Sequence, residues 1–428
     1  MARIVMKFGG TSVANLDRIR HVSQLVEAEV KEGNEVAVVV SAMSGETNRL
    51  VALVDELDAD SPQQGETLGG DIEDEYDSIV ATGEQVTSGL LAIALRRRGL
   101  KARSWLGWQI PLRTDMAHSK ARIAEIESSA IGPSMEDGNV AVVAGFQGIS
   151  DDGRISTLGR GGSDTSAVAL AVALKADRCD IYTDVDGIYT TDPRIAKDAR
   201  RLNRIAFEEM LELASLGAKV LQTRSVELAM NNNLPIRVLT SMAQVGDANP
   251  GTLVCNEDET MEERVVSGVA YSRDEAQITL LQLQDQPGMV AKVCKAMSEA
   301  NVIVDMIVQG ISRNDNAANL TFTVGKRDLD KALKALEKSK NEIGFEGIKS
   351  DDAVTKVSVV GIGMRSHTGV AQTMFEALAE RGINVEVIAT SEIKISVLID
   401  SEYTELAVRA LHNAFGLHEA GKLKVSAP

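Results

Sequence analysis

The sequence predicts an α/β protein, in which a mostly parallel sheet sandwiched by helices is followed by two small ferredoxin-like α+β units. Three observations predict this class. Short apolar runs typical of buried strands alternate with helical patterns in the first half of the chain. Aromatic residues make up only 3% of the 428 residues, so the core must consist of aliphatic side chains, which suits helices packed on a sheet. A weak internal repeat follows near the end of the chain.

Each strand of the predicted sheet is a short apolar run, and the runs cover residues 3–8, 35–40, 140–146 and 180–183. After the first run, Ile19, Val22, Val26 and Val30 recur at helical spacing, and the pattern ends at Gly33. Residues 163–176 read as a nearly all-apolar helix, which we expect to be buried. In sheets of this kind, sites form where loops leave the carboxyl ends of the strands.

A domain boundary is expected after Asn249-Pro250-Gly251, within the acidic stretch 256–263. The predicted domains are residues 1–255, 264–350 and 351–428. The last two carry the repeat, because Gly288–Ile307 aligns with Gly369–Ile388 at a constant offset of 81 residues. Each copy places a strand before the glycine, a helix after it and a strand at its end, with the first strands at 277–284 and 354–361.

Composition excludes several classes of function. There are 45 Lys and Arg against 62 Asp and Glu, and the resulting charge of −17 disfavours binding to nucleic acid or to an anionic membrane. The longest apolar run, Ala167–Leu174, is far shorter than the ~20 residues that span a bilayer. Three widely spaced cysteines indicate a reduced cytoplasm, with neither disulfides nor structural zinc. Walker, Rossmann and HExxH motifs are absent, and the five histidines form no ligand motif.

Glycine-rich segments follow the predicted strands. Residues 7–12 (KFGGTS) combine a lysine with two glycines, whose backbone N–H groups can approach a phosphate closely. A tight turn with a surface lysine explains the same residues. Residues 41–45 (SAMSG) read as an ordinary turn on their own. Residues 159–165 (GRGGSDT) favour an anion site, because a helix cap needs Ser163 or Asp164 but not Arg160.

Other residues become candidates only together with these segments. The loop 183–194 follows the fourth strand, Lys219 is a second possible phosphate cation, and Glu84 is a possible acceptor for a substrate ammonium. The alternatives are a loop of turn formers, a solvated helix lysine and a surface glutamate. Taken together, the strand ends predict a phosphoryl-transfer site built from loops along one edge of the sheet.

These motifs resemble those of the aspartate kinases of the amino-acid kinase superfamily. The resemblance rests on KFGGTSV (7–13), SAMSG (41–45), GE (83–84), GRGGSDTSA (159–167) and TDVDGIYTTDPR (183–194), and the repeat is similar to tandem ACT domains. It implies an amino-acid-kinase-type fold and ATP-dependent phosphorylation of the β-carboxylate of L-aspartate. That reaction is the first step toward lysine, threonine, methionine and diaminopimelate. A carboxylate of pKa ~3.9 is already ionised at pH 7, so no general base is needed.

The resemblance also implies roles for individual residues. Those implied in catalysis are Lys7, Gly9, Gly10 and Asp164, with Asp164 orienting Lys7 and Lys219. Those implied in ATP binding are Lys7, Gly9, Gly10, Ser41, Thr183, Asp184, Tyr189, Arg194 and Lys219. Those implied in aspartate binding are Thr47, Glu84, Arg160, Gly161, Gly162 and Ser163. Mg²⁺ is expected to arrive with ATP, held largely by phosphate oxygens and water, and no protein ligand for a metal is assigned.

The ACT pair implies feedback inhibition by lysine, threonine or both. The matching effector positions are Asp285, Gly288, Ala291, Gln309 and Asn384. Where the second copy has Asn384, the first has Ile303, which cannot hydrogen-bond an amino-acid ligand through its side chain, so one effector site is expected to be altered or lost. A homodimer or higher oligomer is expected, and Met261 is the candidate start of a separate regulatory subunit.

Two alternatives remain open from the sequence. A sister kinase acting on glutamate or acetylglutamate shares the fold, although the ACT pair and the Glu84/Arg160 combination argue against it. A non-catalytic amino-acid sensor retains the ACT pair, although Lys7 and Asp164 are both present.

Overall fold

The computed structural model describes residues 2–59, 72–110, 112–159, 161–216, 220–257, 265–284, 286–312 and 317–419. The chain forms two compact units. The first consists of Met1–Ile188, Arg201–Ala214 and Lys219–Glu257, and the second of Tyr189–Arg200, Ser215–Ala218 and Asp258–Pro428. The predicted boundary after residue 255 therefore does not describe the two units completely. Segment 189–200 precedes this boundary but belongs to the second unit.

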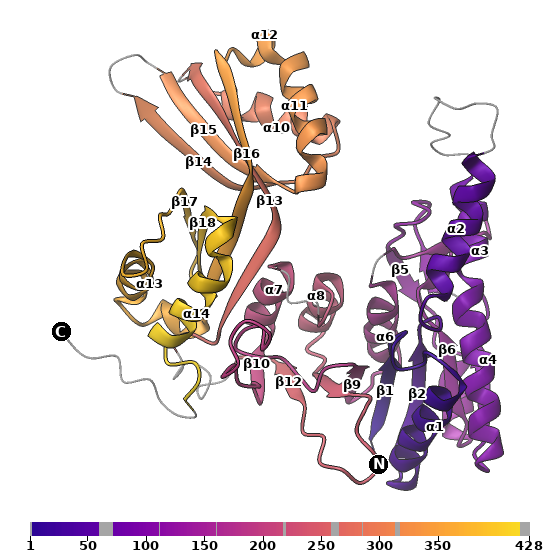
Figure 1. Ribbon diagram of the computed structural model, residues 1–428. Helices are drawn as coiled ribbons and strands as arrows, with labels where there is room; N and C mark the ends of the chain where they lie inside the picture. Colours follow the sequence, from indigo (N-terminus) through magenta and orange to yellow (C-terminus); the bar gives the residue numbers. More distant parts are fainter. Residues whose placement is uncertain are drawn as a thin grey trace. The chain divides into compact units, whose positions relative to one another are not determined.

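An eight-stranded sheet forms the centre of the first unit (Figure 1). Its strands, in spatial order, are β10 (Arg204–Ala206), β12 (Thr252–Cys255), β11 (Ile236–Thr240), β9 (Arg178–Thr183), β1 (Arg3–Phe8), β2 (Glu35–Val40), β6 (Val140–Ala144) and β3 (Ala102–Trp105). The pairs around β1 are parallel, and Phe8 lies opposite both Val40 and Tyr182. The carboxyl ends of β1, β2 and β9 consequently meet at one edge, as the sequence predicts.

Helices cover both faces of this sheet because its central strands are apolar on both sides. Alternate side chains of β1, β2 and β6 pack against α1 (Leu16–Lys31) and α4 (Thr82–Arg97). On the other face α6 (Gly162–Ala173) contacts β1, β2 and β9 and packs against α8 (Thr223–Asn231). The remaining helices of this unit are α2 (Glu46–Ala59), α3 (Glu73–Val80), α5 (Ile131–Glu136) and α7 (Phe207–Ser215).

The predicted strand bounds agree with the structure at 3–8 and 35–40. The run at 140–146 ends as a strand at Ala144, because Phe146 takes a left-handed conformation with a φ of 68°. The predicted helix 163–176 is α6, which ends at Ala173, two residues before Lys175 adopts a φ of 50°. The strand predicted at 180–183 begins earlier, at Arg178.

A small four-stranded sheet lies beside these elements. Its order is β5 (Ile123–Ile126), β4 (Leu112–Thr114), β7 (Gln147–Ile149) and β8 (Ile155–Thr157). Strands β7 and β8 form an antiparallel hairpin, and β8 leads directly into the glycine-rich segment before α6. The hairpin thus sets the starting point of that segment.

One stretch of the described chain, Glu73–Arg97, is long and apolar enough by length and composition to cross a membrane, and half of its apolar window is buried. It comprises α3 and α4. The buried side chains of α4 include Leu91 and Leu95, which belong to the core between α4, α1 and the sheet. The apolar composition is therefore explained by packing inside the first unit.

The second unit is built on a six-stranded sheet. Its order is β14 (Val304–Ser312), β15 (Ala317–Val324), β13 (Gly268–Gln284), β16 (Gly347–Val360), β18 (Lys394–Asp400) and β17 (Val387–Thr390). Its helices are α10 (Met289–Glu299), α11 (Leu329–Lys338), α12 (Lys340–Ile343), α13 (Val370–Ala379) and α14 (Thr404–Ala414), with 3-10 turns η1 (Lys326–Asp328), η2 (Ile362–Arg365) and η3 (Ser401–Tyr403).

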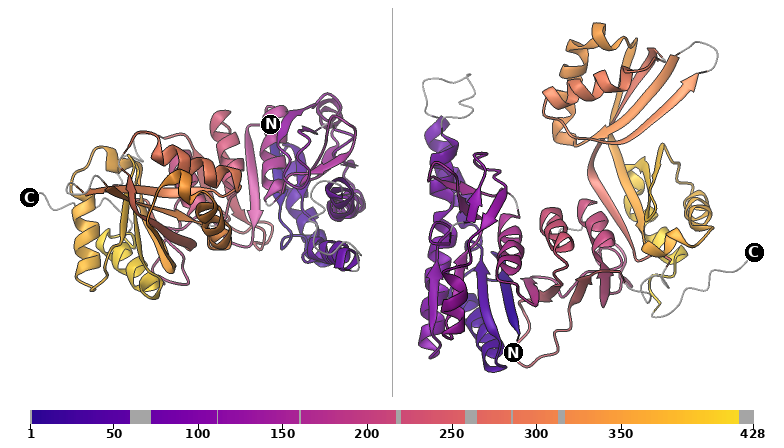
Figure 2. Two further views of the ribbon diagram at one scale, coloured as in Figure 1. Left: turned by 90° about the horizontal axis from the view of Figure 1, so that it is seen from above. Right: turned by 180° about the vertical axis from the view of Figure 1, so that it is seen from behind.

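Within the second unit, the two small α+β halves share the long strands β13 and β16. These strands continue from the half with α10 and α11 to the half with α13 and α14 (Figures 1 and 2). One core, with α10 and α11, takes its β13 residues from Ala276 onward. The other core, with α13 and α14, includes Val269 of β13. The predicted cut between residues 350 and 351 falls inside β16, so a single cut in the sequence does not separate the two units.

The internal repeat corresponds to a repeated local geometry. Gly288 and Gly369 immediately precede α10 and α13, and their φ angles are 94° and 91°. These left-handed values favour glycine, which explains why both copies have it there. Ile307 and Ile388, at the other end of the repeat, lie on the edge strands β14 and β17.

Candidate active site

A hollow of about 460 Å³ lies at the carboxyl edge of the parallel strands. We call it the strand-end hollow. Its lining comes from the three glycine-rich segments, from α2, from the start of α4 and from the residues after β6. It consists of Lys7, Gly10, Thr11, Ser41, Ala42, Met43, Ser44, Gly45, Thr47, Asn48, Glu84, Phe146, Gly159, Gly161, Gly162, Ser163 and Asp164. Segments that are far apart in the sequence therefore form one site.

Lys7 and Asp164 form an ion pair inside the hollow. The Nζ of Lys7, near the end of β1, lies 2.6 Å from Oδ1 of Asp164 in the first turn of α6, and each side chain is 11% exposed. The carboxylate offsets the cost of keeping the ammonium out of bulk water. Because an ammonium has three N–H groups, the pair leaves Lys7 able to donate to a further acceptor.

The backbone after β1 approaches its neighbours so closely that side chains would interfere. A Cβ on Gly9 would lie 3.2 Å from Nζ of Lys7, and one on Gly10 would lie 3.1 Å from the carbonyl oxygen of Ala42. Beyond the glycines, Ser12 Oγ donates to Ser241 Oγ at 2.8 Å, at the end of β11. The turn is thus fixed to the end of β11, and the backbone N–H of Gly9 donates to the carbonyl oxygen of Tyr182 at 3.4 Å.

Glu84 is a buried carboxylate with an unused oxygen. It lies in the first turn of α4 and is 3% exposed. Its Oε1 accepts from the backbone N–H of Ala42 at 3.0 Å, whereas Oε2 has no hydrogen-bond partner among the residues that the structure describes. Burial raises the pKa of Glu84 to about 7, although the Ala42 N–H opposes this shift. A bound cation stabilises the ionised form of such a buried carboxylate.

The segment before α6 is held by residues that the sequence analysis did not identify. Asp77 on α3 is fully buried and accepts from the backbone N–H of Thr157 at 2.8 Å and of Ser119 at 2.9 Å. Arg224 on α8 donates to the carbonyl oxygen of Leu158 at 3.0 Å. Neither residue belongs to a glycine-rich motif, and only the three-dimensional contacts identify them.

Gly161 has a φ of 73°, and a Cβ there would lie 1.9 Å from Cγ of Gln222. Only glycine therefore fits between this segment and the start of α8. Its neighbour Arg160, as well as Lys219, lies outside the described residues. The structure thus does not test whether these two cations face the hollow with Lys7.

The remaining predicted residues divide into three groups. Ser41, Thr47 and Ser163 line the hollow. Thr183 is the last residue of β9, the strand beside β1, Asp184 follows it, and the hydroxyl of Thr183 donates to Asp184 at 3.1 Å. Tyr189 and Arg194 belong to segment 189–200 of the second unit, where Arg194 pairs with Asp192 at 2.7 Å. Their place in a nucleotide site remains a prediction.

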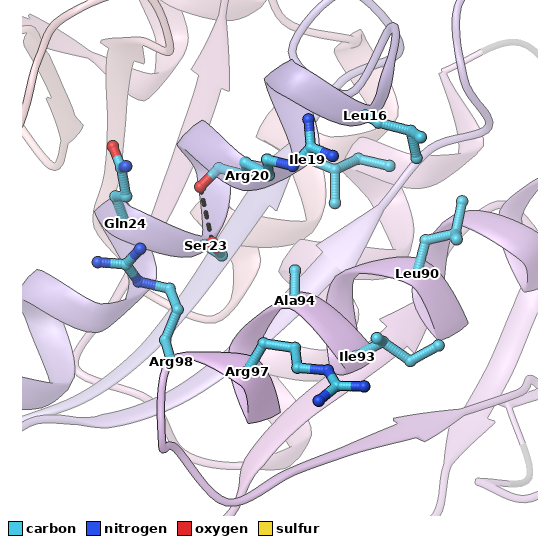
Figure 3. A pocket seen from close by; sticks show the side chains of 10 residues that line it. All are labelled: Leu16, Ile19, Arg20, Ser23, Gln24, Leu90, Ile93, Ala94, Arg97 and Arg98. Atoms are coloured by element: carbon cyan, nitrogen blue, oxygen red, sulfur yellow. Dashed lines mark hydrogen bonds between the residues drawn. The ribbon is translucent and has the colours of Figure 1, made fainter.

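A second hollow, of about 490 Å³, lies between α1 and α4 (Figure 3). Apolar side chains such as Leu16 and Ile93 line it together with Arg20, Arg97 and Arg98. Two of its arginines are paired with acidic groups, Arg20 with Asp17 and Arg98 with Glu27. No glycine-rich strand end contributes to its lining. Its chemistry does not support phosphoryl transfer.

The chain matches known families along most of its length. Residues 2–240 match the amino acid kinase family, and residues 278–341 and 357–415 each match the ACT domain. The "Aspartate kinase" of Pseudomonas putida is 52% identical over 97% of this chain and 98% of that protein. The chain belongs to the aspartate kinase family.

Solved structures of the family resemble the whole chain. Escherichia coli aspartokinase III in complex with aspartate and ADP, described as the R-state, has a TM-score of 0.78 and 28% identity, covering 96% of this chain and 99% of that one. The same enzyme with lysine and aspartate, described as the T-state, has a TM-score of 0.73 at the same identity and coverage. Membership in this family makes the chain an enzyme and decides against the sister kinases and the non-catalytic sensor.

The predicted effector positions lie on the ACT domains. Gly288 precedes α10, Ala291 lies on α10, Gln309 lies on β14 and Asn384 precedes β17, and all four are exposed. Asp285 lies outside the described residues. Ile303 is 84% exposed, which is unusual for an isoleucine. The ACT domains imply allosteric regulation of the enzyme.

Proposed function

We propose that the strand-end hollow transfers the γ-phosphoryl group of ATP to the β-carboxylate of L-aspartate, and that the ACT domains subject this reaction to feedback inhibition. The observation that carries the proposal is the Lys7–Asp164 pair beside the glycine turn of Gly9 and Gly10, with an oxygen of Glu84 in the same hollow that has no hydrogen-bond partner among the described residues. The complex of the related E. coli enzyme with aspartate and ADP supports the choice of substrates.

In this proposal, one set of residues in the hollow binds the transferring phosphoryl group of ATP and another set binds aspartate. Lys7 and the N–H groups of Gly9 and Gly10 neutralise charge on the transferring phosphoryl group. Glu84 accepts the ammonium of aspartate, while Thr47, Arg160 and the segment Gly161–Ser163 hold the rest of the molecule. Because the acceptor is a carboxylate, the enzyme supplies alignment and neutralisation rather than a base. Asp164 keeps Lys7 oriented toward the phosphate.

The nucleotide sites are proposed at two strand ends. Ser41 follows β2, Thr183 ends β9 and Asp184 follows it. Tyr189, Arg194 and Lys219 complete the ATP contacts. The glycine backbone suits a phosphate chain, because residues without a Cβ let backbone N–H groups approach a phosphate closely. Mg²⁺ fits as a companion of ATP that neutralises phosphate charge. The one aspartate in the lining of the hollow, Asp164, is already paired with Lys7, so we assign no protein ligand to the ion.

Regulation and assembly complete the proposal. We expect lysine, threonine or both to bind at Asp285, Gly288, Ala291, Gln309 and Asn384, and the lysine complex of the E. coli relative supports lysine. A homodimer or larger oligomer, a regulatory subunit starting near Met261, which lies outside the described residues, and a cytoplasmic location remain expectations. Inhibition assays with lysine and threonine, singly and together, identify the effector.

Replacing Lys7 tests the assignment of the hollow. In Lys7→Ala the phosphoryl group loses a fixed positive charge, so we expect kcat to fall by ~10²-fold or more. Aspartate binding should persist, since the proposed aspartate contacts are other residues. Trapping the acyl phosphate with hydroxylamine measures the product, and offering aspartate, glutamate and acetylglutamate in turn identifies the acceptor.

Lys31→Ala is the matched control for this experiment, because Lys31 is 71% exposed at the end of α1 and does not line the hollow. It should retain full activity. Normal turnover in Lys7→Ala would disprove the proposed site, whereas a product formed only from glutamate would disprove the proposed substrate.

A further inference from the structure

Three potential metal ligands converge in the second unit. Asp198, His412 and His418 each offer one ligand atom, and these atoms lie within 4.8 Å of one another. Asp198 comes from segment 189–200, His412 from α14, and His418 from the residues just after that helix. The spacing of the histidines in the sequence gives no ligand motif, and the cluster arises only in space, where His412 and His418 meet an aspartate more than 200 positions earlier.

His412 is the buried member of the cluster. Its side chain is 0% exposed, yet its Nδ1 has no hydrogen-bond partner among the described residues. The nearest acidic atom is Oδ1 of Asp198, at 3.8 Å, which is too far for a hydrogen bond. A buried polar atom without a partner is costly, so its presence requires an explanation.

The other nitrogen of His412 is occupied. Nε2 lies 3.0 Å from the hydroxyl oxygen of Thr190, and the same oxygen accepts from the backbone N–H of Arg200 at 3.0 Å. If Nε2–H donates to Thr190, Nδ1 carries a lone pair that points toward Asp198 and His418. Metal-binding histidines have this arrangement, in which the second ring nitrogen donates to an oxygen that fixes the ring.

We propose that Asp198, His412 and His418 bind one Zn²⁺ ion, with Thr190 fixing the orientation of His412. Two imidazoles and one carboxylate form a donor set that suits Zn²⁺, whereas Mg²⁺ and Ca²⁺ prefer oxygen ligands alone. The ion ties segment 189–200 to the end of the second ACT domain. This site is separate from the magnesium that accompanies ATP and does not depend on the proposed residues of the strand-end hollow.

The geometry needs only a small adjustment. Ligand atoms about 2.1 Å from a tetrahedral zinc lie roughly 3.4 Å from one another. The three ligand atoms here lie within 4.8 Å of one another, so the adjustment is at most about 1.4 Å. The side chains of Asp198 and His418 are 52% and 40% exposed, so they can rotate toward the fixed Nδ1 of His412. Arg200 places a positive charge near His412, which repels a cation. The negative charge of the Asp198 carboxylate offsets this repulsion.

Zinc uptake by the full chain tests the proposal. All proteins carry Cys294→Ser, because Cys294 is a free, exposed cysteine and a thiolate is a zinc ligand that would compete with the cluster. After treatment with a chelator, the chain is titrated with Zn²⁺ in competition with a chromophoric indicator. We expect one tight equivalent per chain, and at least ~10-fold weaker binding at that equivalent in His418→Ala and in Asp198→Asn. Both replaced side chains are exposed, so the fold should persist.

His367→Ala is the matched control, because His367 is an exposed histidine of the same unit outside the cluster. It should bind zinc as the parent does. Zn²⁺ should also raise the melting temperature of the parent and of His367→Ala, but not that of His418→Ala. Equal zinc affinity and stoichiometry in the parent, His418→Ala and Asp198→Asn would overturn the proposal, as would a parent that takes up no tight equivalent.

Discussion

At the scale of single residues, Glu84 is held in a state that opposes folding. Its pKa is raised to about 7 by burial, against an ordinary value of 4.5. Between these two pH values, the folded chain keeps a proton that the unfolded chain has released. The stability that the folded chain draws from the protonated Glu84 is therefore fully present below pH 4.5. It is lost as the pH rises through about 7. The buried carboxylate of Glu84 thus destabilises the fold at neutral pH. It lies where we propose that the ammonium of aspartate binds.

This cost predicts that Glu84→Gln is more stable than the parent at pH 8 and equally stable near pH 4.5. The shift corresponds to about 3 kcal/mol of unfolding free energy at the upper pH. Thermal or denaturant unfolding at the two pH values measures it. Saturating aspartate should narrow the difference, because its ammonium pairs with the parent carboxylate but not with the amide.

The same substitution should raise the KM for aspartate at least ~10-fold and remove the rise of kcat/KM through pH 7 that ionisation of Glu84 produces. Glu46→Gln provides the control, because Glu46 also lies near the hollow but pairs with Arg49, which lowers its pKa. A stability difference for Glu84→Gln that is the same at pH 4.5 and pH 8 would contradict the interpretation of Glu84.

At the scale of elements, the glycine-rich segment before α6 depends on a contact with α3. Asp77 receives two backbone N–H groups and the hydroxyl of Thr157, two residues before Gly159. His118 also lies 3.1 Å from the same carboxylate. A carboxylate can accept all of these donors, whereas an amide turns one donor toward them. Asp77 is thus a positioning residue for the segment that carries the proposed aspartate contacts.

We therefore expect Asp77→Asn to lower the unfolding free energy by about 1–3 kcal/mol, because a buried donor loses its acceptor. Well below the melting temperature, kcat/KM for aspartate should fall ~10-fold or more through misplacement of the segment. Asp74→Asn on the same helix removes only a partly exposed pair with Arg154 and should change both quantities little. Full activity of Asp77→Asn would show that the segment keeps its position without this contact.

The sequence predicts the strand ends but not the contacts that position them. Lys7, Ser163 and Asp164 stand in glycine-rich motifs at parallel strand ends, which carry a local signal, whereas Ser41 is identified only through the family resemblance. Asp77 has no such signal, since its partners lie on a different strand and in a loop about 40 to 80 residues away. Segment 189–200 was assigned to the catalytic domain because it directly follows β9, but its packing contacts are with the second unit.

At the scale of the whole molecule, the two ACT domains are joined by an ion cluster as well as by shared strands. Nζ of Lys356 on β16 lies 2.7 Å from Glu275 on β13 and 2.6 Å from Asp305 on β14. The register between β13 and β16 shifts beside Glu275, between the parts of these strands that serve the two cores. Burial lowers the pKa of Lys356, but the two carboxylates outweigh it, so the pKa is raised.

Because its pKa is raised, Lys356 contributes stability that is present below its ordinary value of 10.5 and is lost only as the pH rises through the raised value.

Lys356→Met leaves Glu275 buried without its cation, which should lower the unfolding free energy by about 3–5 kcal/mol at neutral pH. Since both cores rest on β13 and β16, hydrogen exchange should accelerate in α11 and in α14 alike. Lys349→Met, an exposed position on the same strand, should leave both helices protected. Acceleration confined to one helix would mean that the two ACT domains unfold independently, and that effector binding in one domain cannot reach the other through the shared sheet.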